Sequence, residues 1–440
     1  MSTNNKCAET KRFLPALAAL PLCLMAASSQ AESLEERVAR LEAALAAQQP
    51  SENKTAAKSS NGKTEYSFGG YIKLDAISSQ YSGGERATSA VGDDFLVAST
   101  IPVGGESGDA NFDMQARHSR LWFKTVTPTA AGQVSSYIEM DFGVNQIGDE
   151  RISNSSVNRI RQAYVSWQYD ADSSLLAGQS WSTFFNVASL PETLDFVGPV
   201  GTLFERQSQL RWTHGLGDGS SVMFALENPS TGLYGAAGSD AGGGAYDNNS
   251  LPDVVLRYNG TSGSLSYSLA SVIREIAYKQ DFNNSAAVAV SGDESEMGYG
   301  VSAAMIWKLG ADDLKVQLNA GNALGRYMGL QSYRDGMIED SGDIELIDEI
   351  GGFIAYRHFW NDQWRSSIVL SASSADNPDE VAATTSKSYQ SLHLNLLYSP
   401  VAALTLGAEF IHASRNIEGE VNGDDSGELD RLQFSVKYVF

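Results

Sequence analysis

The chain has 440 residues, a net charge of −22 and only two cysteines. Cys7 and Cys23 lie in an N-terminal segment that we expect to be removed. The mature chain would then have no thiol for a disulfide framework, a Cys-ligated metal or a cysteine nucleophile. Most of the acidic excess falls in long polar connections, so the net charge says little about the interior of the fold. We expect no nucleic-acid partner.

Residues 1–31 have the organisation of a cleaved signal peptide. Three basic residues precede an apolar stretch over 13–25, and small residues follow up to Ala31. The apolar stretch is too short to span a bilayer as a helix. We therefore expect cleavage after Ala31.

Residues 32–49 are predicted to form a short coiled-coil helix in the periplasm. Leu34, Val38, Leu41 and Leu45 are spaced as the a/d seam of about two heptads. A helix this short is marginal alone, so we expect partner helices, and peptidoglycan is a further candidate contact. The alternative is a solitary helix at the mouth of the fold. Residues 50–64, rich in Ser, Asn, Lys and Ala, are predicted to be a flexible linker.

From residue 65 to the end, the chain has the alternation of β-strands. In the last strand, Leu432, Phe434, Val436, Tyr438 and Phe440 share one face, and polar residues occupy the other. This pattern suits a strand whose apolar face meets lipid and whose neighbour closes a barrel. The terminal Phe also resembles the C-terminal signal of bacterial outer-membrane barrels.

Tight turns alternate with long Gly/Ser/Asp-rich connections, as in outer-membrane barrels. The pattern predicts an all-β fold, a transmembrane antiparallel β-barrel of about sixteen strands over 65–440, a size that encloses a water-filled channel. The expected strand cores are 65–77, 114–126, 132–143, 157–170, 172–180, 205–214, 219–228, 251–259, 263–273, 296–308, 312–322, 344–360, 363–374, 386–399, 402–412 and 430–440. The acidic long connections would contact lipopolysaccharide through divalent cations, or would simply keep exposed loops soluble.

Basic residues concentrate on the early strands, opposite apolar neighbours. An arginine that faces lipid at mid-depth costs about 2–4 kcal/mol, which favours an inward direction. Arg206 has the same parity as the apolar Leu210 and Trp212, which would point it toward lipid. It lies at the junction with a loop, however, where alternation does not fix the direction of a side chain. The alternative is that each arginine pairs with Glu139, Asp141 or Glu205 and only supports the wall. The predicted basic wall consists of Lys73, Arg120, Lys124, Arg159, Arg161, Arg206 and Arg211.

The third long connection, residues 181–201, is apolar and aromatic where the others are polar. A loop of that composition should not stand in water. We expect it to fold into the barrel, narrow the channel and present Glu192 and Asp195 opposite the arginines. The alternative is a contact within a trimer.

An inward third loop opposite a basic strand cluster resembles the trimeric general porins. The N-terminal heptads together with segments 69–75, 116–121, 137–142 and 178–184 resemble the DcaP-like porins more closely. This resemblance implies a homotrimer with a periplasmic coiled coil and passive uptake of small organic acids, dicarboxylates among them. Trp122 stands where such barrels often carry a small residue, so the resemblance does not extend to the width of the pore.

Other classes fit less well. Five histidines are scattered over different strands without metal-ligand spacing, so we expect no enzyme, catalytic group, metal or cofactor. A transporter with a plug domain would need more than the short segment between Ala31 and Tyr66. The sequence therefore predicts an outer-membrane porin that favours small organic anions. The alternatives are a non-selective general porin and a barrel that serves mainly as a cell-wall anchor.

Overall fold

The computed structural model describes residues 64–86, 91–143, 156–236 and 247–440. The predicted signal peptide, coiled-coil helix and nearly all of the linker lie before residue 64, outside the described residues. Among the described residues, no helix is long and apolar enough to cross a membrane.

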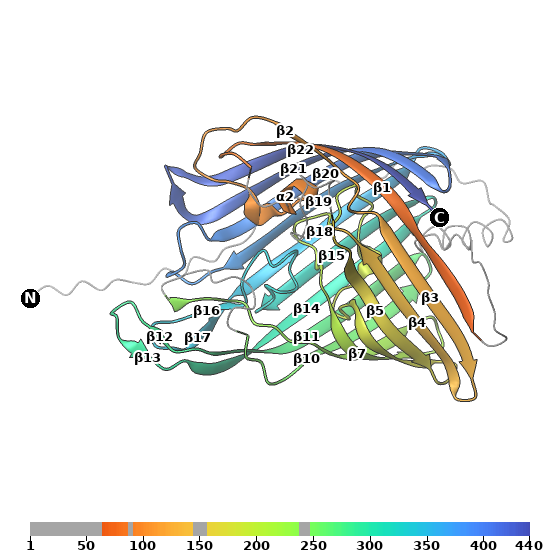
Figure 1. The fold of residues 1–440 in the computed structure, drawn as a ribbon, viewed down its shortest axis with the longest axis horizontal. Helices are drawn as coiled ribbons and strands as arrows, with labels where there is room; N and C mark the ends of the chain where they lie inside the picture. The colour runs from red at the N-terminus through yellow and green to blue at the C-terminus, as the bar shows by residue number, and fades with distance from the viewer. Residues whose placement is uncertain (1–63, 87–90, 144–155, 237–246) are drawn as a thin grey trace, which may run out of the picture. The chain divides into compact units, whose positions relative to one another are not determined.

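Sixteen long strands form one antiparallel sheet that closes on itself (Figure 1). Successive strands pair with each other, and the last closes the ring by pairing with the first, from Tyr71–Val439 to Tyr81–Leu429. The expected barrel and its strand number are confirmed. Its strands are β1 (Glu65–Tyr81), β3 (Arg120–Thr129), β4 (Gly132–Asp141), β5 (Arg159–Gln168), β6 (Ser173–Trp181), β7 (Arg206–Gly215), β8 (Ser221–Glu227), β10 (Asp253–Ser262), β11 (Leu265–Lys279), β14 (Asp293–Leu309), β15 (Asp312–Asn322), β18 (Asp348–Phe359), β19 (Trp364–Asp376), β20 (Ser386–Val401), β21 (Leu404–Val421) and β22 (Asp424–Val439).

Two predicted boundaries were wrong. The strand expected over 114–126 is broken, because β2 (Asn111–Gln115) and β3 pair with the same edge of β1 but a turn separates them. The long connection expected over 413–429 is instead the outer part of a hairpin between β21 and β22. Its turn consists of Asn422 and Gly423, both with positive φ (53° and 95°), which is the backbone that a two-residue hairpin turn favours.

The outer face of the barrel is apolar. Leu432, Phe434, Val436 and Tyr438 are all exposed, while Gln433 between them is buried. This alternation is what a wall between lipid and lumen requires. Exposed tryptophans gather beside the tight turns, as in an aromatic girdle: Trp167, Trp307, Trp360 and Trp364. We call this end of the barrel the turn end, and the opposite one the loop end.

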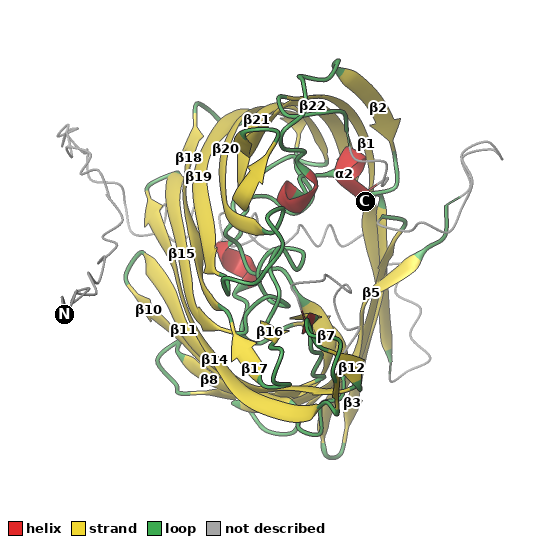
Figure 2. Cartoon of the chain, turned by 90° about the vertical axis from the view of Figure 1, so that its left-hand side faces the viewer, coloured by secondary structure: helices red, strands yellow, loops and turns green. Residues whose placement is uncertain are grey.

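Parts of three long connections fold into the barrel, within the described residues 91–101, 182–205 and 323–347. Figure 2 shows loops and short helices inside the ring of strands. Most of their buried apolar residues form one cluster with inward-facing residues of the wall. Ala323 and Ile338 belong to a smaller second cluster. The short elements in and near these loops are α2 (Val91–Asp94), η1 (Ala98–Thr100), η2 (Val187–Ser189), β9 (Leu233–Tyr234), β12 (Phe282–Asn283), β13 (Ala289–Val290), β16 (Gly336–Ile338) and β17 (Ile344–Leu346).

Candidate solute pathway

The 182–205 loop crosses the lumen and is fixed to the far wall by hydrogen bonds. Glu409 on β21 accepts the backbone N–H groups of Leu194 and Asp195 at 2.7 and 3.2 Å. Gly201 donates its N–H to Ser371 Oγ on β19 at 2.8 Å. A Cβ on Gly201 would meet the Ala372 carbonyl oxygen at 2.4 Å, so only glycine allows this close approach. The loop therefore narrows the lumen as an integral part of the wall.

The apolar composition of this loop is satisfied inside the barrel. Phe184 and Phe185 are each 1 % exposed. Phe204 packs edge-on to Trp181 at 5.0 Å between ring centroids. These contacts place aromatic rings next to the arginines of β5 and β7, since Arg161 lies over Trp181.

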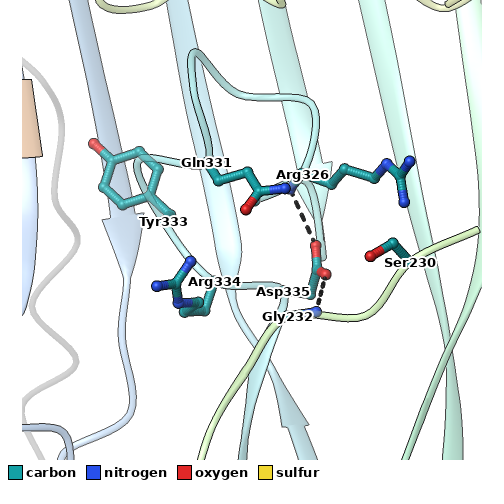
Figure 3. A pocket seen from close by; sticks show the side chains of 8 residues that line it. Ser230, Gly232, Arg326, Gln331, Tyr333, Arg334 and Asp335 are labelled. Carbon is teal, nitrogen blue, oxygen red and sulfur yellow. Dashed lines mark hydrogen bonds between the residues drawn. The ribbon is translucent and has the colours of Figure 1, made fainter. Parts of the chain in front are cut away.

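The 323–347 loop is a second inner loop that sequence reasoning missed. Arg274 on β11 donates to Asp335 at 2.7 Å, and both side chains are buried. Figure 3 shows the Asp335 carboxylate accepting the backbone N–H groups of Gly232 and Arg326. The cavity beside these residues, about 10 Å³, is large enough for about one water molecule. The apolar run of Leu324, Tyr327, Met328, Tyr333 and Met337 was the available signal.

The predicted arginines on β3 and β5 are brought together with the predicted carboxylates. Arg159 holds Asp141 through two hydrogen bonds, at 2.7 and 3.2 Å. Arg161, 2 % exposed, bridges Glu139 and Asp141 at 2.7 and 2.8 Å. Arg120 lies 3.7 Å from Glu139. A register shift between β4 and β5 at this point lets Arg159 and Arg161 share the same carboxylate.

Arg206 differs from these paired arginines. Its guanidinium lies 4.6 Å from the ring centroid of Trp181, and its buried Nη1 has no hydrogen-bond partner among the described residues. Arg206 and Arg159 line a cavity of about 370 Å³ together with Phe196 and Phe204. Glu205 lines the same cavity and lies 3.9 Å from Arg326, outside this group. Within the group, four guanidinium groups face two carboxylates, which leaves an excess of positive charge. The group consists of Arg120, Arg159, Arg161, Arg206, Glu139 and Asp141.

The two predicted acids of the 182–205 loop have other partners than expected. Glu192 lies against the opposite wall, where it pairs with Arg357 at 2.9 Å and Arg365 at 2.6 Å. Burial disfavours its ionisation, but the hydrogen bonds and charges of these arginines outweigh burial and lower its pKa to about 2. Asp195 does not face the arginines, because its buried carboxylate accepts backbone N–H groups that shape the loop, from Leu96, Val197 and Gly198.

The remaining predicted cations lie on inward-facing positions. Lys73 is 3.1 Å from Asp75 and donates to the Leu194 carbonyl at 2.8 Å, so it anchors the 182–205 loop. Lys124 and Arg211 lie nearer the turn end and are partly buried.

Further cations on later strands were missed by the sequence reasoning, which concentrated on the early strands. They occupy positions with the same inward parity, near the turn end: Arg257, Lys315, Arg357, Arg365 and Lys437. For Arg257, Lys315 and Lys437 the signal was a basic residue between apolar or aromatic neighbours, as in Leu256-Arg257-Tyr258. No three His, Cys, Asp or Glu side chains come close enough to hold a metal ion in the described part of the chain.

A closed sixteen-stranded barrel with an apolar outer face and inward loops defines the class of outer-membrane β-barrels of porin architecture. The family model of the DcaP outer membrane protein matches residues 30–440. The chain therefore belongs to the DcaP outer membrane protein family, and the protein is located in the outer membrane. By the rule for such barrels, the turn end faces the periplasm.

Solved structures give the same fold. The outer membrane channel DcaP of Acinetobacter baumannii matches with a TM-score of 0.71 and 21% identity, over 88% of this chain and all of that one. OmpT of Vibrio cholerae matches with a TM-score of 0.52 and 11% identity, over 87% and 100% of the two chains. Its trimer form matches with 0.50 and 10%, over 86% and 100%. The matched DcaP of Acinetobacter baumannii is an outer membrane channel, and OmpT is an outer membrane protein. No curated protein matches the chain.

Proposed function

We propose that the protein is a passive diffusion channel that favours small organic anions, with dicarboxylates as the substrate class. The observation that carries this proposal is the excess of guanidinium groups over carboxylates beside the 182–205 loop, and above all the position of Arg206. Its charge is not compensated by an ion pair among the described residues, and it lines a cavity.

The physical argument is electrostatic. Confined water and a wall of low dielectric screen charges poorly, so an uncompensated cation raises the local concentration of anions. A guanidinium also offers two parallel N–H donors to a carboxylate. The acidic outer loops oppose anion entry, but screening limits their reach to about 10 Å at 0.1 M salt.

The test is the reversal potential in a salt gradient across a planar bilayer. We expect the wild type to prefer anions, and Arg206→Ala to reduce that preference. Lys279→Ala is the matched control, because Lys279 lies at the loop end, is 63% exposed and pairs with Asp293. A cation-preferring wild type, or an Arg206→Ala variant with unchanged selectivity, would favour a non-selective porin. A channel that conducts no current would favour a cell-wall anchor.

We further propose that the protein is a homotrimer with its N-terminal helix in the periplasm, surrounded by lipid and lipopolysaccharide. The apolar outer face supports contacts with lipid and with neighbouring barrels. Closed cyclic symmetry is the usual outcome for a self-complementary surface.

A further inference from the structure

The turn end of the lumen contains cations that are not part of the arginine cluster on β3, β5 and β7. Arg211 lies four residues before the end of β7, Arg257 lies five residues before the end of β10, and Lys315 lies three residues after the start of β15. At about 3.3 Å per residue, all three lie roughly 10–17 Å from the turns, measured along the strands. We call them the turn-side cluster.

The turn-side cluster lies beneath the 182–205 loop and is tied to it. Arg257 donates to the Phe185 carbonyl at 3.0 Å. Lys315 donates to the carbonyls of Ala188 and Leu190 at 3.2 and 2.6 Å. These bonds use neutral acceptors, so the loop positions the two cations without neutralising their charge.

Among the described residues, no carboxylate forms an ion pair with the cluster. Neither Arg211, Arg257 nor Lys315 makes an ion pair there, and the buried Nε of Arg211 has no hydrogen-bond partner. Asp313 and Glu192 lie near enough to attract Lys315, but both are already paired with Arg357. Glu227 is near enough to attract Arg211, but its oxygens already accept from Ser182, Thr183 and Gln207.

Arg211 and Arg257 share a wall. Strand β8 lies between them and places Ala225 opposite Arg211 and Met223 opposite Arg257. The two guanidinium groups are close enough to repel each other. An anion between them would relieve this repulsion and would use the free donors of both side chains.

We infer that the channel has a second carboxylate-binding site, formed by Arg211 and Arg257 with Lys315 nearby, on the periplasmic side of the 182–205 loop. This inference rests on the proposed anion pathway and adds to it. A solute that passes the Arg159–Arg206 cavity would meet the second site before it leaves the barrel. A solute that enters from the periplasm would reach the second site without passing the 182–205 loop that narrows the lumen.

The experiment measures block of chloride current by succinate in single channels of known orientation. Residues 64–440 contain no cysteine, so Ala286→Cys at the loop end, labelled with a bulky thiol reagent, reports the orientation. We expect Arg211→Gln/Arg257→Gln to raise the half-blocking succinate concentration about tenfold from the periplasmic side, with little change from the outer side. Lys387→Gln, an exposed loop-end residue, is the control and should leave both values unchanged.

The inference is wrong if the double variant blocks like the wild type, or if both sides change equally. Arg211→Lys/Arg257→Lys is the control for a folding defect in the Gln variant, because it keeps both charges. We expect it to keep the anion selectivity of the wild type and to weaken succinate block from the periplasmic side. Equal block by this variant and the wild type would also count against the site. If the wild type itself shows neither anion preference nor succinate block, the proposed function fails. If Arg206→Ala lowers selectivity and the double variant does not alter block, only the second site fails.

Discussion

At the scale of single residues, Glu205 is the carboxyl group that lines the same cavity as Arg206. Its carboxylate lies 3.9 Å from Arg326 and is 22% exposed. Burial raises its pKa to about 7, although Arg326 and Arg206 act in the opposite direction and nearby Glu227 acts with burial. The carboxyl group is therefore mostly neutral at pH 6 and mostly ionised at pH 8.

We predict that anion preference falls as pH rises from 6 to 8. Ionisation of Glu205 places a negative charge beside Arg206 and reduces the attraction of anions there. The measurement is the reversal potential at both pH values, in the wild type and in Glu205→Gln. The variant should have the same selectivity at pH 8 as at pH 6. A pH dependence that survives in the variant would assign the titration to another group.

Glu192 has the opposite relation to its arginines. Its pKa of about 2 means that it is ionised at every pH at which the channel works, and it compensates Arg357 and Arg365. We predict that Glu192→Gln increases anion preference, because it uncovers positive charge in the lumen. Reversal potentials should shift in the direction opposite to that of Arg206→Ala. Glu420→Gln, exposed on the outer hairpin, is the control. A shift toward cations would show that the freed arginines do not face the solute.

At the scale of elements, the 182–205 loop depends on Glu409. Its buried carboxylate accepts Leu194 and Asp195 and also bonds to Asn395. We predict that Glu409→Gln loosens the loop, because an amide nitrogen would face a backbone N–H. A buried donor left unsatisfied costs about 1–3 kcal/mol. Single-channel recordings should show larger and noisier currents than in the wild type. Unchanged conductance and noise would mean that the other contacts hold the loop alone.

The sequence predicted those elements whose signal is local. Period-two alternation located most strands, and the apolar composition of residues 181–201 identified the loop that enters the barrel. The break at 116–119 was missed although the exposed apolar residues change parity across it, from Phe112 and Met114 to Leu121 and Phe123. The interruption itself depends on contacts inside the barrel. There His118 is fully buried against Phe196, at 4.5 Å between ring centroids.

The sequence predicted which residues line the candidate site better than it predicted which of them pair with each other. Parity placed Arg120, Arg159 and Arg161 inside, but the choice between a free and a paired arginine depends on a third strand or a crossing loop. Asp195 shows why pairings could not be predicted, since its carboxylate oxygen accepts the backbone N–H groups of Val197 and Gly198 in its own loop and does not pair with an arginine. Arg257 and Lys315 were missed because their positions relative to the 182–205 loop depend on the path of that loop through the barrel.

At the scale of the whole molecule, positive charge gathers toward the periplasmic end of the lumen, while the outer hairpin of β21 and β22 is acidic. Exposed Glu420, Asp424, Asp425 and Glu428 lie at its tip. Such asymmetry orders the pathway: acidic rim, arginine cluster, 182–205 loop, turn-side cluster. The arginine cluster lies on the outer side of the 182–205 loop and the turn-side cluster on its periplasmic side. We therefore expect substitutions in the first to change ion selectivity, and substitutions in the second to change succinate block from the periplasmic side.

The last prediction concerns assembly. The apolar outer wall of the barrel is far larger than a helix of about two heptads, so most of the association energy should come from the wall. We predict a trimer that migrates differently after heating, and that remains a trimer when residues 32–49 are deleted, with a lower yield of assembled protein. The measurement is gel mobility before and after heating, together with mass determination in mild detergent. Deletion of residues 50–63 instead is a control for chain length, and it should leave the trimer and its yield intact. A monomer in mild detergent with the full chain would contradict the trimer, and a monomer only after deletion would assign assembly to the helix.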